Sequence, residues 1–334
     1  MPSIHIPDQA AWHATRERHV GGSEIASLFY RYRDPSGDEY VLHAYENPPK
    51  DATPLGCVNP WRSSMALFNE KAGIVKPADF SSERMDAGRY VEPAIAEWSI
   101  HKYGWPLRKV RRYLTHDTVP GWGASLDFEI HGDGVSGVPV DVKNSDRGHF
   151  NSNWVCEGQE IVAPPLNYIL QIQHQIGVSG ADHGWLLVCV GGNELRRGRI
   201  DRHEPTQQRI AEAVTAFWAG VRSETPPLAV ADYPAVAAAY AYGDKQRTVD
   251  LSGSDGLAET IDAYLVARND LDTQETLVEH LKGKIAAMMG TATRATCGSR
   301  RLSWPVINRA EAMIPARLQE AKTYRGALTI TGDK

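Results

Sequence analysis

The chain has 334 residues, of which 42% are hydrophobic and 23% are charged, and its net charge is −5. This length can bury one sizeable core and an accessory region, and no stretch approaches the roughly 20 apolar residues of a membrane helix. The first residues contain neither an apolar run nor a small-residue cleavage site, so we expect no signal peptide and a cytoplasmic protein. The acidic balance argues mildly against a nucleic-acid ligand, although an enzyme that takes DNA into a channel can concentrate its basic residues locally.

The cysteines are scattered, and no two of them form a C-x-x-C pair. Zinc or iron–sulfur ligation and a disulfide framework are therefore not expected, and isolated reduced thiols are. The cysteines are Cys57, Cys156, Cys189 and Cys297.

The first elements in chain order are helical. Residues 12–30 are expected to form a short helical segment with a Gly-Gly-Ser turn inside it, and the Pro, Asn and Gly content of 44–63 predicts a loop. A longer helix is expected over 85–102, with Pro93 as the position of a kink or of a second helix start and Gly104 as its end.

Strands follow this helix. We expect them over 108–114, 123–130 and 138–143, and the turn signal His-Gly-Asp-Gly at 131–134 joins the last two as a hairpin. A helix over 166–178 comes next.

The pattern then repeats with strands over 184–191 and 195–200 and an amphipathic helix over 206–222, stopped by Pro226 and Pro227. Helices alternating with strands indicate the α/β class, a mixed sheet flanked by helices.

After Pro227 the character changes. We predict an accessory region over 226–334, following a core over 1–225, with a long helix capped by Ser254 and Asp255 that runs to about Met289. Intrachain packing of its apolar stripe is the default, with a second subunit or a partner protein as alternatives. The stripe has heptad-like spacing: Leu257, Ile261, Tyr264, Leu271, Val278, Leu281, Ile285 and Met288. Further strands are expected over 301–307 and 327–330.

The segment Val-Pro-Val-Asp-Val-Lys at 138–143 carries the first chemical signal. Because side chains alternate along a strand, the three valines share the buried face, and Asp141 and Lys143 share the other. A carboxylate that grips a divalent cation, beside a Lys that orients or activates water, suits metal-assisted phosphodiester cleavage. Taken alone, such a D-x-K pair is also common on strand faces with mixed charges.

Asp127 strengthens this interpretation because the hairpin brings it next to Asp141. Two carboxylates and the Val142 carbonyl form an oxygen site suited to Mg²⁺ or Mn²⁺. Glu92, on the preceding helix, could add a third carboxylate, the alternative being a solvated helical acid.

On the helix over 166–178, Gln171 and Gln175 lie one turn apart on one face and Gln173 lies elsewhere. A Gln facing a charged site can hydrogen-bond water, Lys or phosphate, and the alternative is an ordinary polar face.

Together, these motifs resemble those of the PD-(D/E)XK nucleases, in particular lambda exonuclease and its YqaJ-like viral recombinase relatives. The W-H-x-x-R and S-E pattern of the family falls on Trp12-His13, Arg16 and Ser23-Glu24. The other motifs fall on Gly88 and Glu92 (G-x-x-x-E), Ser125 and Asp127 (S-x-D), Asp141 and Lys143 (D-x-K), and Gln171 and Gln173 (Q-x-Q). The likeness covers about residues 10–225, and 226–334 resembles the helical extension of longer prophage members.

The resemblance implies a PD-(D/E)XK core and a role for each matching residue. Arg16 and Ser23 would hold the 5′-phosphate of a DNA end, Lys143 would be catalytic and Gln171 would support the site. Two Mg²⁺ (or Mn²⁺) ions would be bound by Glu92, Asp127, Asp141 and the Val142 carbonyl.

The expected activity is therefore a Mg²⁺-dependent exonuclease that hydrolyses double-stranded DNA from its ends, 5′ to 3′, in the cytoplasm of a bacterium or of a phage-infected host. A single-strand annealing protein is the expected partner, and the resemblance implies a homo-oligomer of the ring-trimer kind. One alternative is an endonuclease or a CRISPR-adaptation nuclease, the latter disfavoured because clustered iron–sulfur cysteines are absent. The other is a non-catalytic scaffold that binds DNA ends.

Some residues outside these motifs could contact DNA. The basic run that contains Arg108, Arg111 and Arg112 could bind phosphates or be a solvated strand. Of the tryptophans, Trp122 is expected to pack in the core or at its rim, and Trp154 is the better candidate for stacking on bases. Gln173 is a further possible DNA contact.

Overall fold

The computed structural model describes residues 2–76, 82–132, 135–227, 232–241 and 246–306. The chain forms two compact units that divide after Ala241. The boundary expected between residues 225 and 226 stays a prediction.

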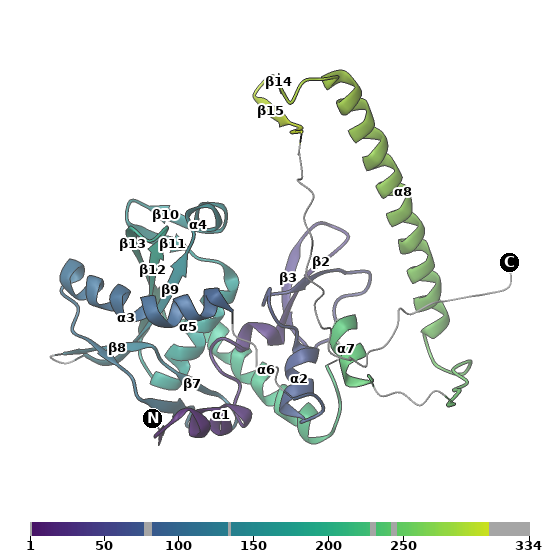
Figure 1. The fold of residues 1–334 in the computed structure, drawn as a ribbon. Helices are drawn as coiled ribbons and strands as arrows, with labels where there is room; N and C mark the ends of the chain where they lie inside the picture. Colours follow the sequence, from purple (N-terminus) through teal and green to yellow (C-terminus); the bar gives the residue numbers. More distant parts are fainter. Residues whose placement is uncertain (1, 77–81, 133–134, 228–231, 242–245, 307–334) are drawn as a thin grey trace, which may run out of the picture. The chain divides into compact units, whose positions relative to one another are not determined.

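The first unit is built on a seven-stranded mixed sheet (Figure 1). Its central strands β9 and β12 are parallel, with Trp185 beside Val140 and Leu187 beside Val142. In sheet order the strands are β10 (Val155–Glu157), β11 (Glu160–Ala163), β13 (Glu194–Asp201), β12 (His183–Val190), β9 (Val135–Ser145), β8 (Phe128–Gly132) and β5 (Leu107–Lys109).

Two helices cover the two faces of this sheet. Helix α3 (Glu83–Tyr103) packs its buried Ile95 against Val140 and Leu187. Helix α5 (Leu166–Ser179) packs Ile172 and Ile176 against the opposite face of β12, at Leu186 and Val188. The expected α/β class, a mixed sheet flanked by helices, is confirmed.

Two small antiparallel sheets and five short helical segments complete the unit, and helix α6 (Glu204–Arg222) packs on α5. The sheets are β1 (Ser3–His5), β6 (Arg112–Thr115) and β7 (Gly123–Ser125), and β3 (Glu39–His43), β2 (Phe29–Arg33) and β4 (Thr53–Cys57). The short segments are α1 (Gln9–Glu17), the 3-10 helix η1 (Ile25–Leu28), α2 (Ser64–Lys71), α4 (Arg147–Asn153) and α7 (Tyr233–Ala239).

Trp122 lies in the largest buried cluster, as expected, and only 1% of it is exposed. Gly177 of α5 allows this packing, because a Cβ there would lie 2.2 Å from Trp122 Cζ2. Helix α5 can therefore approach the ring as closely as it does only with glycine at this position.

The predictions of single strands over 108–114 and 123–130 are wrong in one respect. Each segment forms two strands, and the two strands belong to different sheets. Strands β5 and β8 pair in the seven-stranded sheet, whereas β6 and β7 pair in a small one. The two chain segments bend together, and the Val110 N–H donates to the Asp127 carbonyl at the bend, 3.4 Å apart. Asp127 thus lies where the chain passes between sheets.

The expected loop over 44–63 was also wrong in part, since β4 lies within it. Its Pro54 and Gly56 lowered the strand signal, but β4 is an edge strand, where a missing N–H is tolerated. The hairpin between β8 and β9 and the helices over 85–102, 166–178 and 206–222 are confirmed.

The second unit contains α8 (Leu257–Met289), which is the long green helix of Figure 1, and the hairpin of β14 (Arg294–Cys297) and β15 (Arg300–Ser303). The helix begins after Gly256, at φ 72°, and not at a cap by Ser254 or Asp255. The expected strand over 301–307 is β15 as far as Ser303, and that over 327–330 lies outside the described residues.

All four cysteines are free thiols. Among the described residues, no helix is long and apolar enough to cross a membrane.

Candidate active site

Strand β9 positions Asp141 and Lys143 by simple alternation. Val140 and Val142 face α3 and are buried, as expected. The opposite face is not open to solvent, because α5 covers it: Asp141 is completely buried, and 21% of the Lys143 side chain is exposed. This face of the strand is therefore a buried polar site.

Both oxygens of Asp141 are engaged. Oδ1 accepts hydrogen bonds from the side-chain amides of Gln171 at 2.7 Å and Gln175 at 2.9 Å, and Oδ2 lies 2.7 Å from Lys143 Nζ. The two glutamines share one face of α5, as their spacing predicted. Charge-assisted hydrogen bonds of this kind fix a carboxylate in one orientation.

Asp127 is held against the same strand, since its Oδ2 accepts a hydrogen bond from the Val142 N–H at 3.1 Å. Burial raises the pKa of Asp127 to about 7, and the nearby charge of Asp141 acts in the same direction. For Lys143, burial works to lower the pKa, but the attraction of Asp141 and Asp127 outweighs it and the pKa is raised. The carboxylates thus outnumber the cation that sits between them.

Glu92 projects from α3 into the same region. Its carboxylate is paired with Lys109, whose Nζ also lies 4.9 Å from the centre of the Phe128 ring. Pro93 is tolerated inside this unbroken helix. Among the described residues, no three His, Cys, Asp or Glu side chains are grouped closely enough to hold a metal ion.

A cavity of about 290 Å³ joins these residues. It is lined by Glu92, Asp127, Val142 and Lys143 together with Gln171 and Gln175 from α5. Its other wall is the N-terminal segment, which contributes Trp12, Arg16 and the Gly-Gly-Ser turn at 21–23. The structure therefore brings together at least one residue of every motif that the sequence singled out, whereas Asp141, Gly88 and Gln173 do not line the cavity.

The carboxylates at this site fit a divalent cation, with Asp127 on the cavity wall and Asp141 buried behind it. Asp127 and Asp141 are oxygen donors of the kind that Mg²⁺ and Mn²⁺ prefer. Their mutual repulsion contributes to the raised pKa of Asp127, and the Oε1 atom of the buried Gln175 has no hydrogen-bond partner. A cation beside Asp127 would relieve that repulsion, with Glu92 available if it left Lys109.

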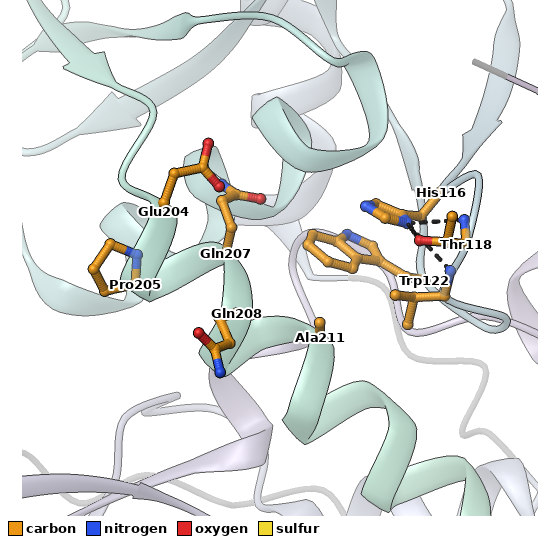
Figure 2. Close-up of a pocket in the computed structure, with 9 residues that line it drawn as sticks. His116, Thr118, Trp122, Glu204, Pro205, Gln207, Gln208 and Ala211 are labelled. Carbon is orange, nitrogen blue, oxygen red and sulfur yellow. Dashed lines mark hydrogen bonds between the residues drawn. The ribbon is translucent and has the colours of Figure 1, made fainter.

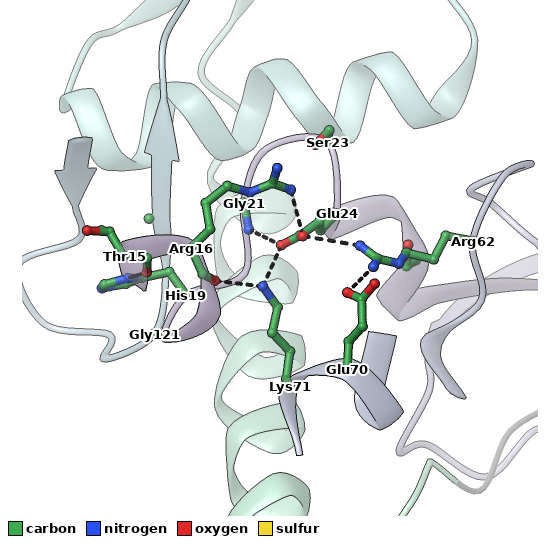
Figure 3. A network of polar contacts seen from close by, with 12 residues as sticks. Thr15, Arg16, His19, Gly21, Ser23, Glu24, Arg62, Glu70, Lys71 and Gly121 are labelled. Carbon is green, nitrogen blue, oxygen red and sulfur yellow. Dashed lines mark hydrogen bonds and ion pairs between the residues drawn. The ribbon is translucent and has the colours of Figure 1, made fainter. Parts of the chain in front are cut away.

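The opposite wall rests on a second charged cluster, centred on Glu24 (Figure 3). Glu24 is 4% exposed, and it accepts from the Gly21 N–H at 2.9 Å. Arg16 Nη2 lies 2.6 Å from it, Lys71 Nζ 3.1 Å and Arg62 Nη1 3.2 Å. Burial works to raise the pKa of Glu24, but these cations and the N–H outweigh it and lower it to about 2.

This cluster orients Arg16 toward the cavity. The guanidinium stacks on the Trp12 ring, 4.6 Å from its centre, and the indole N–H donates to Ser125 Oγ at 2.8 Å. The Arg16 side chain is 26% exposed, and Ser23 is exposed beside it. The cations Arg16, Arg62 and Lys71 outnumber Glu24 and Glu70, so this wall carries surplus positive charge.

The roles of Arg62, Glu70 and Lys71 were not predicted from the sequence. They lie 38 to 47 residues after Glu24, in the region expected to be a loop and in α2, and no spacing rule links them. The one available signal was Glu24 itself, the acid of the S-E motif, because a buried acid requires basic partners.

A larger groove of about 1,120 Å³ begins at the same residues. It shares Ser23, Lys143 and Gln171 with the cavity and continues past Tyr168 to Gly191 and Gly192. Trp61, 73% exposed, also lines it.

Two predicted DNA contacts are wrong because the side chains are buried. Gln173 is 2% exposed: its Nε2 donates to the Asp201 carbonyl at 2.7 Å, and its Oε1 accepts from Gln207 at 2.8 Å. Trp154 is 7% exposed and lies between the Phe150 and Tyr168 rings. The sequence placed Trp154 in a loop, whereas it ends α4 and packs in the core.

The basic run is partly neutralised. Arg108 and Arg112 both bind the buried Glu129, which is 1% exposed, and Arg111 is exposed. A contact between these arginines and DNA stays a prediction.

A separate cavity of about 450 Å³ lies between the loop before β7 and the start of α6 (Figure 2). His116 stacks on Trp122 there, 4.4 Å between ring centres, and its Nδ1 accepts the Thr118 and Val119 N–H groups at 3.2 Å each. None of the predicted site residues lines this cavity.

Comparison with known proteins finds a similar domain. Residues 51–182 match the model of the YqaJ-like viral recombinase domain. The resemblance drawn from the motifs is thereby confirmed, and the matched range contains Glu92, Asp127, Asp141, Lys143 and Gln171.

The chain is also similar to a curated protein, the uncharacterized protein YqaJ of Bacillus subtilis (strain 168). It is 24% identical over 296 residues, 86% of this chain and 89% of the relative. Among solved structures, the alkaline exonuclease LHK-Exo from Laribacter hongkongensis matches 65% of this chain and 94% of its own, with a TM-score of 0.46 and 17% identity. A phage-related exonuclease from Haemophilus somnus 129PT matches 48% and 82%, with a TM-score of 0.36 and 12% identity.

Proposed function

We propose that this protein is a metal-dependent DNA exonuclease that hydrolyses phosphodiester bonds at double-stranded ends, from 5′ to 3′. One observation carries the proposal. A single cavity has Asp127 and Lys143 on one wall, with Asp141 buried beside Lys143, and the surplus cation Arg16, with Ser23, on the other wall. A terminal phosphate held by Arg16 and Ser23 would place the neighbouring phosphodiester beside Asp127 and Lys143.

The acidic wall of the cavity, which contains Asp127, Lys143 and Glu92, supplies the chemistry. Mg²⁺ or Mn²⁺, two ions in the proposal, would be held by Asp127, Asp141, the Val142 carbonyl and Glu92, and would supply activation of water and stabilisation of the leaving 3′-oxygen. Lys143 stays protonated beside Asp141 and can orient the attacking water and neutralise negative charge as it develops on the phosphate. Gln171 and Gln175 keep Asp141 oriented through their amide donors.

The basic wall of the cavity, which contains Arg16 and Ser23, supplies the preference for a DNA end. Glu24 occupies Nη2 of Arg16, and a guanidinium has five N–H donors, so Arg16 retains donors for a phosphate. Ser23 adds a hydroxyl at the same wall. A terminal 5′-phosphate carries more charge than an internal one and would gain most from this wall.

The groove that leads from the cavity is the proposed binding path of one DNA strand. Its exposed Trp61 and partly buried Tyr168 offer ring faces to bases, and Gly191 and Gly192 allow a close approach of the backbone. The arginines at 108, 111 and 112 remain candidates for phosphate contacts. A single-strand annealing protein is the proposed partner for the strand left uncut, and the ring trimer implied by the resemblance stays a prediction.

Digestion of linear duplex DNA tests the proposal. Substrates carry either a 5′-phosphate or a 5′-hydroxyl, closed circular DNA is the control, and Mg²⁺ is added or chelated. We expect Mg²⁺-dependent loss of the linear form alone, faster with the phosphate. Cleavage of the circle would indicate an endonuclease, and binding of ends without cleavage would indicate a scaffold; either result contradicts the proposal.

A further inference from the structure

Within its own unit, helix α8 presents a long apolar surface. It has 33 residues, so it extends about 50 Å, and none of its residues is buried. Leu271 is 50% exposed, Leu281 48% and Met288 88%. A helix with this much exposed apolar surface normally packs against a partner.

The a positions of a seven-residue repeat in α8 are all apolar. With Leu257 at position a, the later a residues are Tyr264, Leu271, Val278 and Ile285. Three of the five d positions are apolar, Ala267, Leu281 and Met288, and two are polar, Thr260 and Gln274. A repeat of this length favours a coiled coil, in which a and d residues form the contact.

The β14–β15 hairpin covers little of this seam. It lies near the last turns of α8, where the seam residue Ile285 lines a cavity of about 560 Å³ with Ala286, Met289 and Leu302, and 46% of Ile285 stays exposed. The seam residues Leu281 and Met288 stay exposed beside it.

The charges that flank the seam select an arrangement for two identical helices. In a parallel pair, Asp270 at g would face Glu275 at e of the other helix, which places like charges together twice. In an antiparallel pair, e positions face e positions, and Arg268 meets Glu275 of the other helix twice. The sequence of α8 therefore favours an antiparallel partner of the same sequence.

We propose that α8 binds α8 of a second copy of this chain as an antiparallel two-stranded coiled coil. In this register each a residue meets a d residue of the other copy. Leu257 packs on Met288, Tyr264 on Leu281, Val278 on Ala267, and Leu271 on Gln274 beside the two-fold axis. Lys282 lies over Ile261 of the other copy, whose apolar side chain its methylenes can cover.

The proposal is independent of the nuclease site, because every residue it uses lies in α8. Mass measurement by light scattering on the full chain tests it. We expect a mass that is an even multiple of the 36.9 kDa of the chain, because α8 joins the copies in pairs. Leu271→Asp should halve this mass at concentrations where the wild type keeps it. Val266→Asp is the matched control, since Val266 is 62% exposed at a c position outside the seam.

Both variants keep an exposed helix, so circular dichroism should show equal helicity. A monomeric wild type at ~100 µM, far above the micromolar affinity of an ordinary specific complex, would overturn the proposal. An oligomer that Leu271→Asp and Val266→Asp leave equally unchanged would overturn it too, since the seam would then not be the interface.

Charge exchange tests the orientation. In the antiparallel pair, Glu275→Arg places a second guanidinium against Arg268 and should weaken the dimer roughly tenfold, because two symmetric pairs change from attraction to repulsion. A parallel pair predicts the opposite sign, because the new guanidinium would then face Asp270. Arg268→Glu should weaken the dimer similarly, and the double exchange should restore it. A tighter Glu275→Arg dimer would contradict the antiparallel arrangement.

Discussion

Asp127 is a partly buried carboxylate and Glu24 a buried one beside the same cavity, and their pKa values shift in opposite directions. That of Asp127 is raised to about 7 by burial and by Asp141, and that of Glu24 is lowered to about 2 because three cations and a backbone N–H outweigh its burial. Each acid has been taken out of water, so the difference comes from its neighbours.

The difference separates a completed cluster from an incomplete one. Around Glu24 the chain supplies more cations than acids, so this cluster stabilises the fold and still has positive charge to offer. Around Asp127 and Asp141 the chain supplies Lys143, and the acids remain in excess. We infer that the acidic wall is built to receive a cation and the basic wall to receive an anion.

The largest expected effect is on catalysis. Lys143→Ala should reduce DNA hydrolysis by about 10³-fold, because one preorganised positive charge at a reacting phosphate contributes on that order. Gel-based digestion of linear duplex measures it, with Lys50→Ala, an exposed lysine in a turn, as the control. Wild-type turnover in Lys143→Ala would remove Lys143 from the site.

Asp127→Asn tests whether the acidic wall costs stability. Without metal at pH 8, the variant should be more stable than the wild type by roughly 2–4 kcal/mol, because a buried charge repelled by Asp141 is gone while the acceptor for the Val142 N–H remains. Urea denaturation with a chelator present measures it. A variant less stable than the wild type would show that Asp127 is a structural acid like Glu24.

Glu24→Gln should have the opposite sign. At pH 7 it should lose about 3 kcal/mol, the free energy that corresponds to a pKa lowered from 4.5 to about 2. Because the pKa is lower in the folded state, this stabilisation is present above about pH 4.5 and is lost as the pH falls toward 2. Denaturation curves across this range should converge at low pH, and the exposed Glu17→Gln should show no such trend.

The smallest effect is expected for Arg16→Ala. It should reduce the ratio of rates on 5′-phosphate and 5′-hydroxyl ends by roughly tenfold, as expected for the loss of one charge-assisted hydrogen bond. The ratio is insensitive to the fraction of folded protein, so the lost contact with Glu24 does not affect it. Arg18→Ala, two residues away and exposed, should keep the ratio, and an unchanged ratio in Arg16→Ala would exclude the phosphate wall.

The sequence predicted those parts of the site that local periodicity determines. Alternation on β9 placed Asp141 and Lys143 on one face, the hairpin placed Asp127 beside them, and helical spacing separated Gln171 and Gln175 from Gln173. These inferences needed neighbours no further away than one turn or one strand pairing.

Burial and long-range partners could not be predicted in the same way. Trp154 has the sequence context of a loop residue, and Phe150 and Tyr168 cover it only after α4 and α5 have packed. Arg62 and Lys71 reach Glu24 from a region without periodic pattern. At Val110 and Asp127, two neighbouring chain segments bend together and pass from one sheet to the other. The residue pattern of either segment alone does not predict this bend.

The most direct test of the account is a calorimetric titration of the metal-free protein with Mn²⁺. The account predicts saturable binding by the wild type, its loss in Asp127→Asn and in Asp141→Asn, and unchanged binding in Glu17→Gln. Binding that survives both substitutions, or a wild type that binds no Mn²⁺, would contradict the claim that this wall is built for a cation.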